Sequence, residues 1–273
     1  MLALRGSGYC LLALTLVLAG CSSPSSRYHY HQDSAPDQDI DVNAIPDAIP
    51  RNEPRSKYGN PDSYVVNGQR YYVMDDAHGY VERGIASWYG KKFHGHRTSS
   101  GEPYNMYAMT AAHTRLPLPA YVQVTNLKNQ RTVVVRVNDR GPFHPNRIID
   151  LSYAAAKKLG ITGKGTAMVE VRAIEPGTTY KVASSKPIDT THMEQAEFHL
   201  YLQVGAFVSR SNAEQLQQKL RTRYTQLNIN AGYNAENNVY RVRIGPLASV
   251  AEADRLAESL SRDGFAMPHI VVD

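Results

Sequence analysis

Cysteine is nearly absent from this sequence of 273 residues, which contains only Cys10 and Cys21. Long hydrophobic runs are also missing, because the apolar run over residues 10–19 is too short to span a bilayer as a helix. The sequence has no cysteine pair at metal-site spacing, no His-Glu-x-x-His motif and no Gly-rich loop ending in Lys-Ser or Lys-Thr. These absences exclude a membrane bundle and a disulfide-stabilised scaffold, and we expect neither a metal ion nor a cofactor.

Acidic side chains are scarce in the middle of the chain, where residues 82–175 carry 14 Lys and Arg against 6 Asp and Glu. Residues 22–81 carry 5 against 9, and residues 196–273 carry 8 of each sign. A positive middle segment favours an anionic polymer, either a nucleic acid or a cell-wall glycan. The sign of the charge alone does not distinguish these two partners.

Residues 1–20 have the build of a secretory signal peptide and are excluded from the fold. Arg5 precedes the apolar run, which ends at Leu18-Ala19-Gly20-Cys21. This ending is similar to the lipobox of bacterial lipoproteins, in which the cysteine is acylated and becomes the mature amino terminus. The alternative is an ordinary signal peptide that happens to contain a cysteine.

A lone thiol at Cys21 supports acylation, because no second cysteine would remain after cleavage to form a disulfide. The two or three acyl chains of a lipoprotein, palmitate among them, hold a protein firmly on a membrane. Ser22 and Ser23 follow in place of Asp. By resemblance to the sorting rule of lipoproteins, this implies an outer-membrane lipoprotein that faces the periplasm.

Composition divides the rest of the chain into five segments. Residues 21–62 are rich in Pro, Ser and Asp and lack an apolar period, which indicates a flexible, extended tether without a core. Residues 63–81 contain apolar runs around Asn67-Gly68, which predict a hairpin that leads into the next domain. The remaining segments are a barrel domain over 82–175, a polar linker over 176–195 and a C-terminal domain over 196–273.

Short β-branched runs, separated by Gly, Pro and Asn, predict a small closed or nearly closed β-barrel over residues 82–175. The runs cover residues 84–89, 121–124, 132–137 and 167–173. Ser152 as a cap and Gly160 as a stop predict one helix over 152–159. The C-terminal domain repeats a strand-helix unit, so we expect one sheet with both helices on one face. Its expected elements cover residues 198–207, 211–224, 239–244, 250–263 and 266–272. The fold is therefore expected to be mainly β, followed by an α+β domain.

Four separated blocks carry the densest functional signal in the barrel domain. They are Ala86-Ser87-Trp88-Tyr89-Gly90, then residues 98–104, then Ala111-Ala112-His113, and finally residues 137–143. At these residues the chain resembles the double-psi β-barrel of the rare lipoprotein A (RlpA) family of septal lytic transglycosylases. The resemblance implies a six-stranded barrel that cleaves between N-acetylmuramic acid and N-acetylglucosamine without water. The muramyl 6-hydroxyl would close a 1,6-anhydro ring on glycan stripped of stem peptides.

Two of the six acidic side chains in the barrel domain lie in Gly-flanked loops, where catalytic groups usually sit: Glu102 and Asp139. Because the nucleophile belongs to the substrate, one carboxyl can both donate and accept the proton. We therefore predict Asp139 as the general acid/base, Glu102 as its partner and His113 as a hydrogen-bonding or pKa-setting neighbour. Alternatively, Asp139 caps a turn and His113 is a packed core residue. Asp150 is expected to support the following helix.

Aromatic and basic side chains supply candidate contacts with the glycan. Trp88, Tyr89 and Tyr104 either stack on sugar faces or form the barrel core, and the sequence does not distinguish the two roles. Arg140, directly after Asp139, is a further candidate.

Residues 202–207 and 240–247 resemble the SPOR domain, which binds peptidoglycan denuded of peptides at division septa. Strand alternation sends Gln203, Gly205 and Phe207 to one face and Leu202, Val204 and Ala206 to the other. With the aliphatic set beneath the helices, Gln203, Arg241 and Arg243 are expected on the exposed face. Tyr240 is also predicted to contact glycan. A sheet that displays aromatics and Arg also resembles an RNA-binding module, but secretion argues against a nucleic acid partner.

Together these features predict an endolytic lytic transglycosylase that acts at the division septum. The alternative is a septal peptidoglycan-binding lipoprotein without turnover, which tethers the outer membrane to the cell wall. The presence of Glu102, Asp139 and His113 favours the enzyme. The sequence predicts no particular protein partner.

Overall fold

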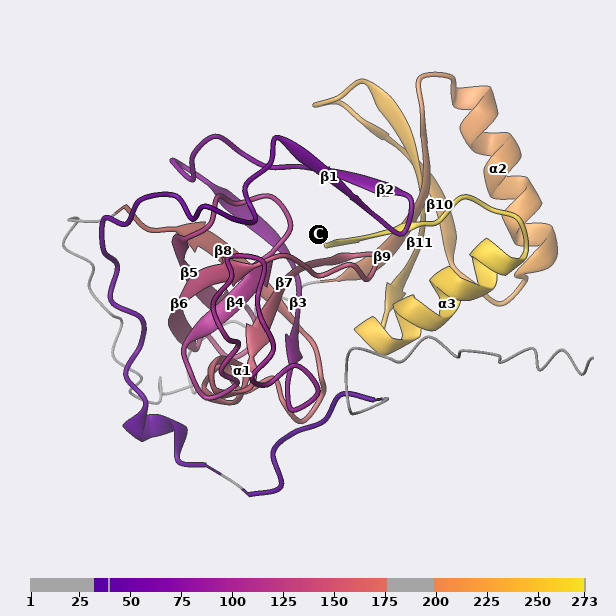
Figure 1. Ribbon diagram of the computed structural model, residues 1–273. Helices are drawn as coiled ribbons and strands as arrows, with labels where there is room; N and C mark the ends of the chain where they lie inside the picture. The colour runs from indigo at the N-terminus through magenta and orange to yellow at the C-terminus, as the bar shows by residue number, and fades with distance from the viewer. Residues whose placement is uncertain (1–31, 39, 176–198, 273) are drawn as a thin grey trace, which may run out of the picture.

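The computed structural model describes residues 32–38, 40–175 and 199–272. The expected signal peptide, Cys21 and the linker over 176–195 lie outside these residues. Within the described ranges, no helix is long and apolar enough to cross a membrane. The two described globular parts are the barrel with its N-terminal additions and the C-terminal sheet with its helices (Figure 1).

Six strands close into a barrel, which confirms the barrel expected from the sequence and its family resemblance. Their order around the barrel is β3-β7-β4-β6-β5-β8. The pairs β3/β7 and β4/β6 are parallel and the other four are antiparallel. The side chains of alternating β-branched residues, such as Val133 and Val135, fill the interior. The strands are β3 (Val81–Tyr89), β4 (Thr110–His113), β5 (Ala120–Asn126), β6 (Thr132–Asp139), β7 (Arg147–Ser152) and β8 (Ala167–Ala173).

The predicted helix is confirmed as α1 (Tyr153–Leu159), which packs against the barrel. The Ser152 hydroxyl accepts a hydrogen bond from the Ala155 amide at 3.2 Å, which satisfies one of the first free donors of the helix. Gly160 ends the helix in the left-handed conformation at φ 78°, which costs a glycine nothing sterically. The cap is therefore Ser152, and Asp150 lies within β7 instead of supporting the helix.

The N-terminal segment differs from the expected tether, because its described residues bind the barrel. Val42, in the short 3₁₀-helix η1 (Val42–Ala44), is buried against the barrel core. The Asp47 carboxylate accepts from the Val134 amide at 3.1 Å, and the Ala48 amide donates to the Val134 carbonyl at 3.1 Å. These bonds satisfy backbone groups of β6. Further upstream, the Asp33 carboxylate accepts from main-chain amides of the loop after β3.

The predicted hairpin is confirmed as β1 (Ser63–Val66) paired antiparallel with β2 (Gln69–Tyr72). Asn67 and Gly68 both have positive φ, as its two-residue turn requires. The Tyr64 and Tyr71 rings stack at 5.3 Å between centroids, and Phe143 from the loop after β6 contacts both rings edge-on.

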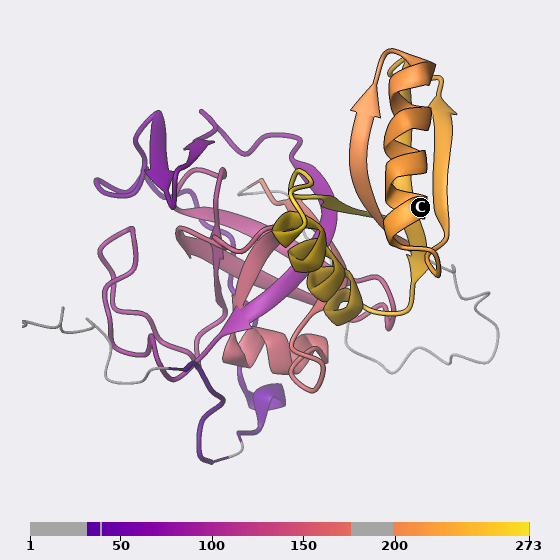
Figure 2. The same ribbon diagram turned by 90° about the vertical axis from the view of Figure 1, so that its right-hand side faces the viewer.

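The C-terminal domain is an antiparallel sheet in the order β10-β11-β9-β12, with both helices on one face (Figure 2). This arrangement confirms the repeated strand-helix unit. Strand β10 was not predicted, because its residues include Asn and Gly, which are uncommon in strands. The elements are β9 (Leu200–Phe207), α2 (Arg210–Arg223), β10 (Ile229–Asn234), β11 (Val239–Leu247), α3 (Val250–Arg262) and β12 (His269–Val272).

A β-bulge in β9 overturns part of the predicted alternation. Arg243 pairs with Gln203 while Val242 pairs with Gly205, so the bulge inserts Val204. Beyond this bulge the faces exchange. Gly205 and Phe207 therefore lie on the helix side, where a Cβ on Gly205 would contact Leu216 of α2.

Candidate active site

Asp139 ends β6, and its carboxylate is held through one oxygen. Oδ1 accepts from the Ser99 amide, the Ser99 hydroxyl and the Arg140 amide, each at 2.7 Å. Burial raises the pKa of Asp139, although the bonds from Ser99 and Arg140 oppose this shift. The group therefore keeps its proton to a higher pH than an ordinary aspartate, which suits a proton donor.

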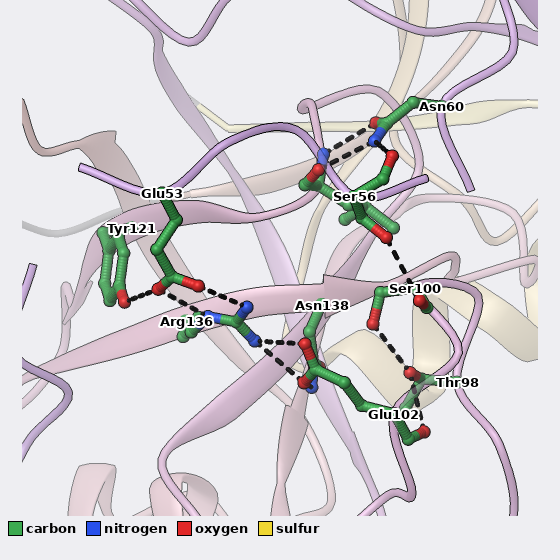
Figure 3. A network of polar contacts seen from close by, with 10 residues as sticks. Glu53, Ser56, Asn60, Thr98, Ser100, Glu102, Tyr121, Arg136 and Asn138 are labelled. Atoms are coloured by element: carbon green, nitrogen blue, oxygen red, sulfur yellow. Dashed lines mark hydrogen bonds and ion pairs between the residues drawn. The ribbon is translucent and has the colours of Figure 1, made fainter. Parts of the chain in front are cut away.

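Glu102 lies in the loop between β3 and β4, and side chains of β6 hold its carboxylate. Arg136 Nη1 donates to both oxygens at 3.0 and 2.9 Å, and Asn138 Nδ2 donates to Oε2 at 2.9 Å (Figure 3). The Thr98 amide and hydroxyl donate to the Glu102 carbonyl and so fix the loop. The Glu102 side chain remains 42% exposed, so a substrate can reach it.

The loop over residues 98–102 joins the two predicted catalytic carboxyls into one site. Its Ser99 binds Asp139, its Ser100 amide donates to the Asn138 carbonyl at 3.3 Å, and Glu102 follows two residues later. The structure therefore connects the loop that carries Glu102 to the end of β6, which carries Asp139. Their catalytic roles remain predictions.

His113 is buried, and its imidazole is fully engaged away from these carboxyls. Nδ1 accepts from the Arg115 and Leu116 amides at 3.1 and 2.9 Å, so Nε2 carries the proton and faces Tyr80 Oη at 2.8 Å. The Tyr80 hydroxyl in turn donates to Glu82 at 2.6 Å. Burial, helped by nearby Arg side chains, lowers the pKa of His113 to about 3, which leaves the ring neutral. Among the described hydrogen bonds, His113 is linked to the site through its main-chain carbonyl, which accepts from the side chain of Arg140, the residue after Asp139.

Arg140 does not present its guanidinium to a glycan, contrary to prediction, because the side chain is buried. It donates to the carbonyls of Gly59, His113 and Leu116 at 2.8, 3.0 and 2.5 Å, and to Asn60 Oδ1 at 3.1 Å. Burial lowers its pKa to about 10. Arg140 therefore fastens the N-terminal segment to the loop after β4.

Two of the three predicted stacking aromatics form core instead. Tyr89 and Tyr104 are buried and stack on each other at 4.0 Å, and the Tyr104 hydroxyl donates to the Tyr89 carbonyl. Neither ring face is open to a sugar. Trp88 is half-buried and contacts the edge of Tyr153 at 5.6 Å. Exposed aromatics occur elsewhere, at Tyr58, Tyr72, Phe143 and Tyr233.

Asp150 is a third carboxyl near the site. It is partly buried, accepts from the Ser87 hydroxyl of β3, and its Oδ2 lies 3.8 Å from where a Cβ on Gly141 would sit. Burial raises its pKa, and the bond from Ser87 opposes this shift. Within the described residues, no group of three or more His, Cys, Asp and Glu side chains is arranged to hold a metal ion.

Sequence reasoning missed Ser99, Arg136, Asn138 and Glu53. Arg136 and Asn138 carried a usable signal, because their spacing of two along a strand puts both on one face. Ser99 lay within a recognised block but had no assigned partner. Glu53 carried no signal, since its contact with Arg136 joins positions 83 residues apart.

The predicted glycan-binding residues of the C-terminal domain divide between the two faces of its sheet. Tyr240 packs with Phe207 against the core on the helix side. Arg241 and Arg243 lie on the helix-free face, as predicted, but they line a cavity of about 490 Å³ shared with Arg83 and Arg147 of the barrel.

The helix-free face is therefore turned toward the barrel, and not freely exposed as expected. The Ile270 amide donates to Asn146 Oδ1 at 3.0 Å across this boundary, and Arg147 lies 3.9 Å from Asp254. Gln203, partly buried, pairs with His269 of β12, which also lines the cavity.

Comparison with known proteins matches both domains. Residues 81–171 match a family described as lytic transglycolase, and residues 196–271 match the SPOR domain. An endolytic peptidoglycan transglycosylase RlpA of Vibrio cholerae is 43% identical over 257 residues, which cover 94% of each chain. A protein of the same name from Pseudomonas aeruginosa is 40% identical and covers 93% of this chain and 88% of its own.

Among solved structures, the SPOR domain of RlpA from Pseudomonas aeruginosa is 35% identical, with a TM-score of 0.25. It covers 26% of this chain and 96% of that domain. The full-length identities, together with the two domain matches in order, establish the family. This chain therefore belongs to the RlpA family, as an enzyme with a lytic transglycosylase barrel followed by a SPOR domain.

Proposed function

We propose that this chain cleaves the bond between N-acetylmuramic acid and N-acetylglucosamine within peptide-stripped peptidoglycan and leaves a 1,6-anhydro end. The observation that carries this proposal is the Asp139 carboxyl, whose pKa is raised by burial and which is held through Oδ1. The names of the relatives support peptidoglycan as the substrate class.

In the proposed step, Asp139 donates its proton to the oxygen that leaves as the N-acetylglucosamine hydroxyl. The bond from that oxygen to C1 of the muramyl residue breaks, and the muramyl 6-oxygen forms a new bond to C1. The proton of the 6-hydroxyl returns to the Asp139 carboxylate, so no water is consumed. The Glu102 carboxylate, paired with Arg136, supplies negative charge beside the positive character that develops on the ring.

We further propose that acylation of Cys21 anchors the chain in the outer membrane and that the SPOR domain binds denuded glycan at the division septum. The lipobox-like ending at Cys21 and the SPOR match over residues 196–271 support this placement. In this proposal the barrel catalyses the cleavage, and the C-terminal domain targets the protein to the septum.

Mass spectrometry of the products tests the reaction. Purified protein spanning residues 22–273, mixed with denuded glycan, is expected to release fragments with anhydromuramyl ends. Reducing muramyl ends would identify a hydrolase instead. Binding without any product would favour a tether between membrane and wall over an enzyme.

A further inference from the structure

Glu53 lies in the N-terminal segment, outside the barrel strands, yet it contacts the side chain that holds Glu102. Figure 3 shows Arg136 between the two carboxylates, with Glu53 on one side and Glu102 on the other. Resting on the proposed function, we propose that Glu53 is a positioning residue, which sets the geometry and charge of Glu102 through Arg136.

The two carboxylates, Glu53 and Glu102, bind different nitrogen atoms of the Arg136 guanidinium. Arg136 Nε and Nη2 donate to the two oxygens of Glu53 at 3.0 and 2.8 Å, a bidentate arrangement. Nη1 remains for Glu102 and donates to both of its oxygens. Because the guanidinium is planar and its donors form a rigid fork, the edge held by Glu53 fixes the direction in which Nη1 points.

The charges support the same role. One Arg136 cation is shared by two carboxylates, so each neutralises only part of it. Without Glu53, the full positive charge would act on Glu102 and weaken the negative charge that Glu102 presents to a cationic transition state. Hydrogen bonding to Arg136 lowers the pKa of Glu53, as expected for a carboxylate that carries charge in this pair.

Glu53 is itself held from both sides along the chain. The Tyr121 hydroxyl donates to its Oε1. Upstream, Asp47 binds the Val134 amide, and downstream the Ser56 hydroxyl donates to the Ser100 carbonyl at 3.1 Å. The Ser56 contact ends on the loop that carries Glu102. The N-terminal segment therefore touches the site at two points, through Arg136 and through this loop.

Kinetics of the Glu53→Gln variant, in protein spanning residues 22–273, test the role. Glutamine keeps the size and removes the charge, so kcat is expected to fall about 10-fold while KM changes less than about 2-fold. The matched control is Asp47→Asn, which weakens the attachment of the same segment to β6 and Lys158 but does not touch Arg136. Its kcat is expected to stay within about 2-fold of wild type.

A second measurement separates positioning from stability. In a Glu102→Gln background, Glu53→Gln is expected to cause no further fall in kcat, because the group on which it acts is already changed. Equal losses in the Glu53 and Asp47 variants, or a full 10-fold loss in the Glu102→Gln background, would overturn the inference. A wild-type protein without product would instead contradict the proposed function, since the Glu53 comparison requires an active wild type.

Discussion

At the scale of single residues, the proposed chemistry depends most directly on Asp139. Asp139→Asn keeps the size of the side chain, and its amide oxygen can still accept from Ser99 and Arg140. The variant has no carboxyl proton to give, so the rate of glycan cleavage is expected to fall at least about 100-fold. Product release from denuded glycan measures the loss.

Folding and binding serve as controls for this variant. A native circular dichroism spectrum and unchanged glycan binding are expected, because neither needs the proton. A near-native rate in a folded Asp139→Asn protein would mean that the acid/base assignment is wrong. Glu102→Gln would then be the next variant to measure.

His113 makes a prediction about stability against pH. Its folded pKa is about 3, whereas an unfolded histidine titrates near 6.5, so between these values the unfolded chain binds a proton that the folded chain does not. The free energy of unfolding therefore falls as pH drops through this window, by up to about 1.4 kcal/mol per unit from this group.

The His113→Asn variant isolates that contribution. Asparagine can supply an acceptor for the Arg115 and Leu116 amides but cannot take up a proton. It is expected to lower stability at pH 8 and to lose part of the difference in stability between pH 8 and pH 5. Urea unfolding at both pH values measures this. An unchanged difference would show that His113 is not the group that titrates.

At the scale of elements, the N-terminal segment is predicted to contribute to the stability of the barrel. Val42→Ala removes buried methyl groups and is expected to lower the free energy of unfolding by about 1–2 kcal/mol. The matched control is Val65→Ala in the exposed hairpin position, expected within about 0.5 kcal/mol of wild type. Urea denaturation compares them, and a free tether would give equal values for both.

How far sequence predicts these elements depends on whether the signal is local. The β-branched runs of β3, β5, β6 and β8 and the caps of α1 are local, and they were predicted. Strands β4 and β7 were not predicted. Strand β4 has only four residues, and the helix that follows β7 masked its strand character. The bulge at Val204 and the docking of the N-terminal segment arise from tertiary pairing, which overrides the local pattern.

The same distinction explains the site. Glu102 and Asp139 were predicted as candidates because each stands in a recognisable Gly-flanked stretch of sequence. By contrast, the neighbouring sequence does not determine whether a residue is buried or exposed in the fold. Tyr89, Tyr104 and Arg140 are of types that often bind sugars, but the fold buries them. Glu53 lay in a segment whose composition indicated a tether.

At the scale of the whole molecule, catalysis and placement are predicted to be separable. A chain truncated after about Lys186 is expected to cut soluble glycan, because the barrel and Glu53 remain. Carrying a fluorescent tag, it is expected to spread around the cell envelope, since a lipid on Cys21 would fix the membrane but not the place on it. Microscopy and product analysis measure the two functions.

The converse protein, residues 196–273 exported alone, is expected to gather at midcell without cleaving glycan. Its helix-free face, with Arg241 and Arg243, would no longer be covered by the barrel. Septal enrichment of the truncated chain would show that the barrel or the N-terminal segment targets the protein to the septum.

The docking of Asp33 onto the barrel limits how far the enzyme can travel from its proposed anchor. The Asp33 carboxylate binds the Gly90 and Lys92 amides at 2.7 and 3.0 Å, only twelve residues beyond Cys21. Even fully extended, the segment from Cys21 to Asp33 reaches about 40 Å. A tether that was free as far as residue 62 would reach about 140 Å. The distance between the outer membrane and the cell wall, rather than diffusion of the barrel over a wide range, would then determine which glycan strands the barrel can reach.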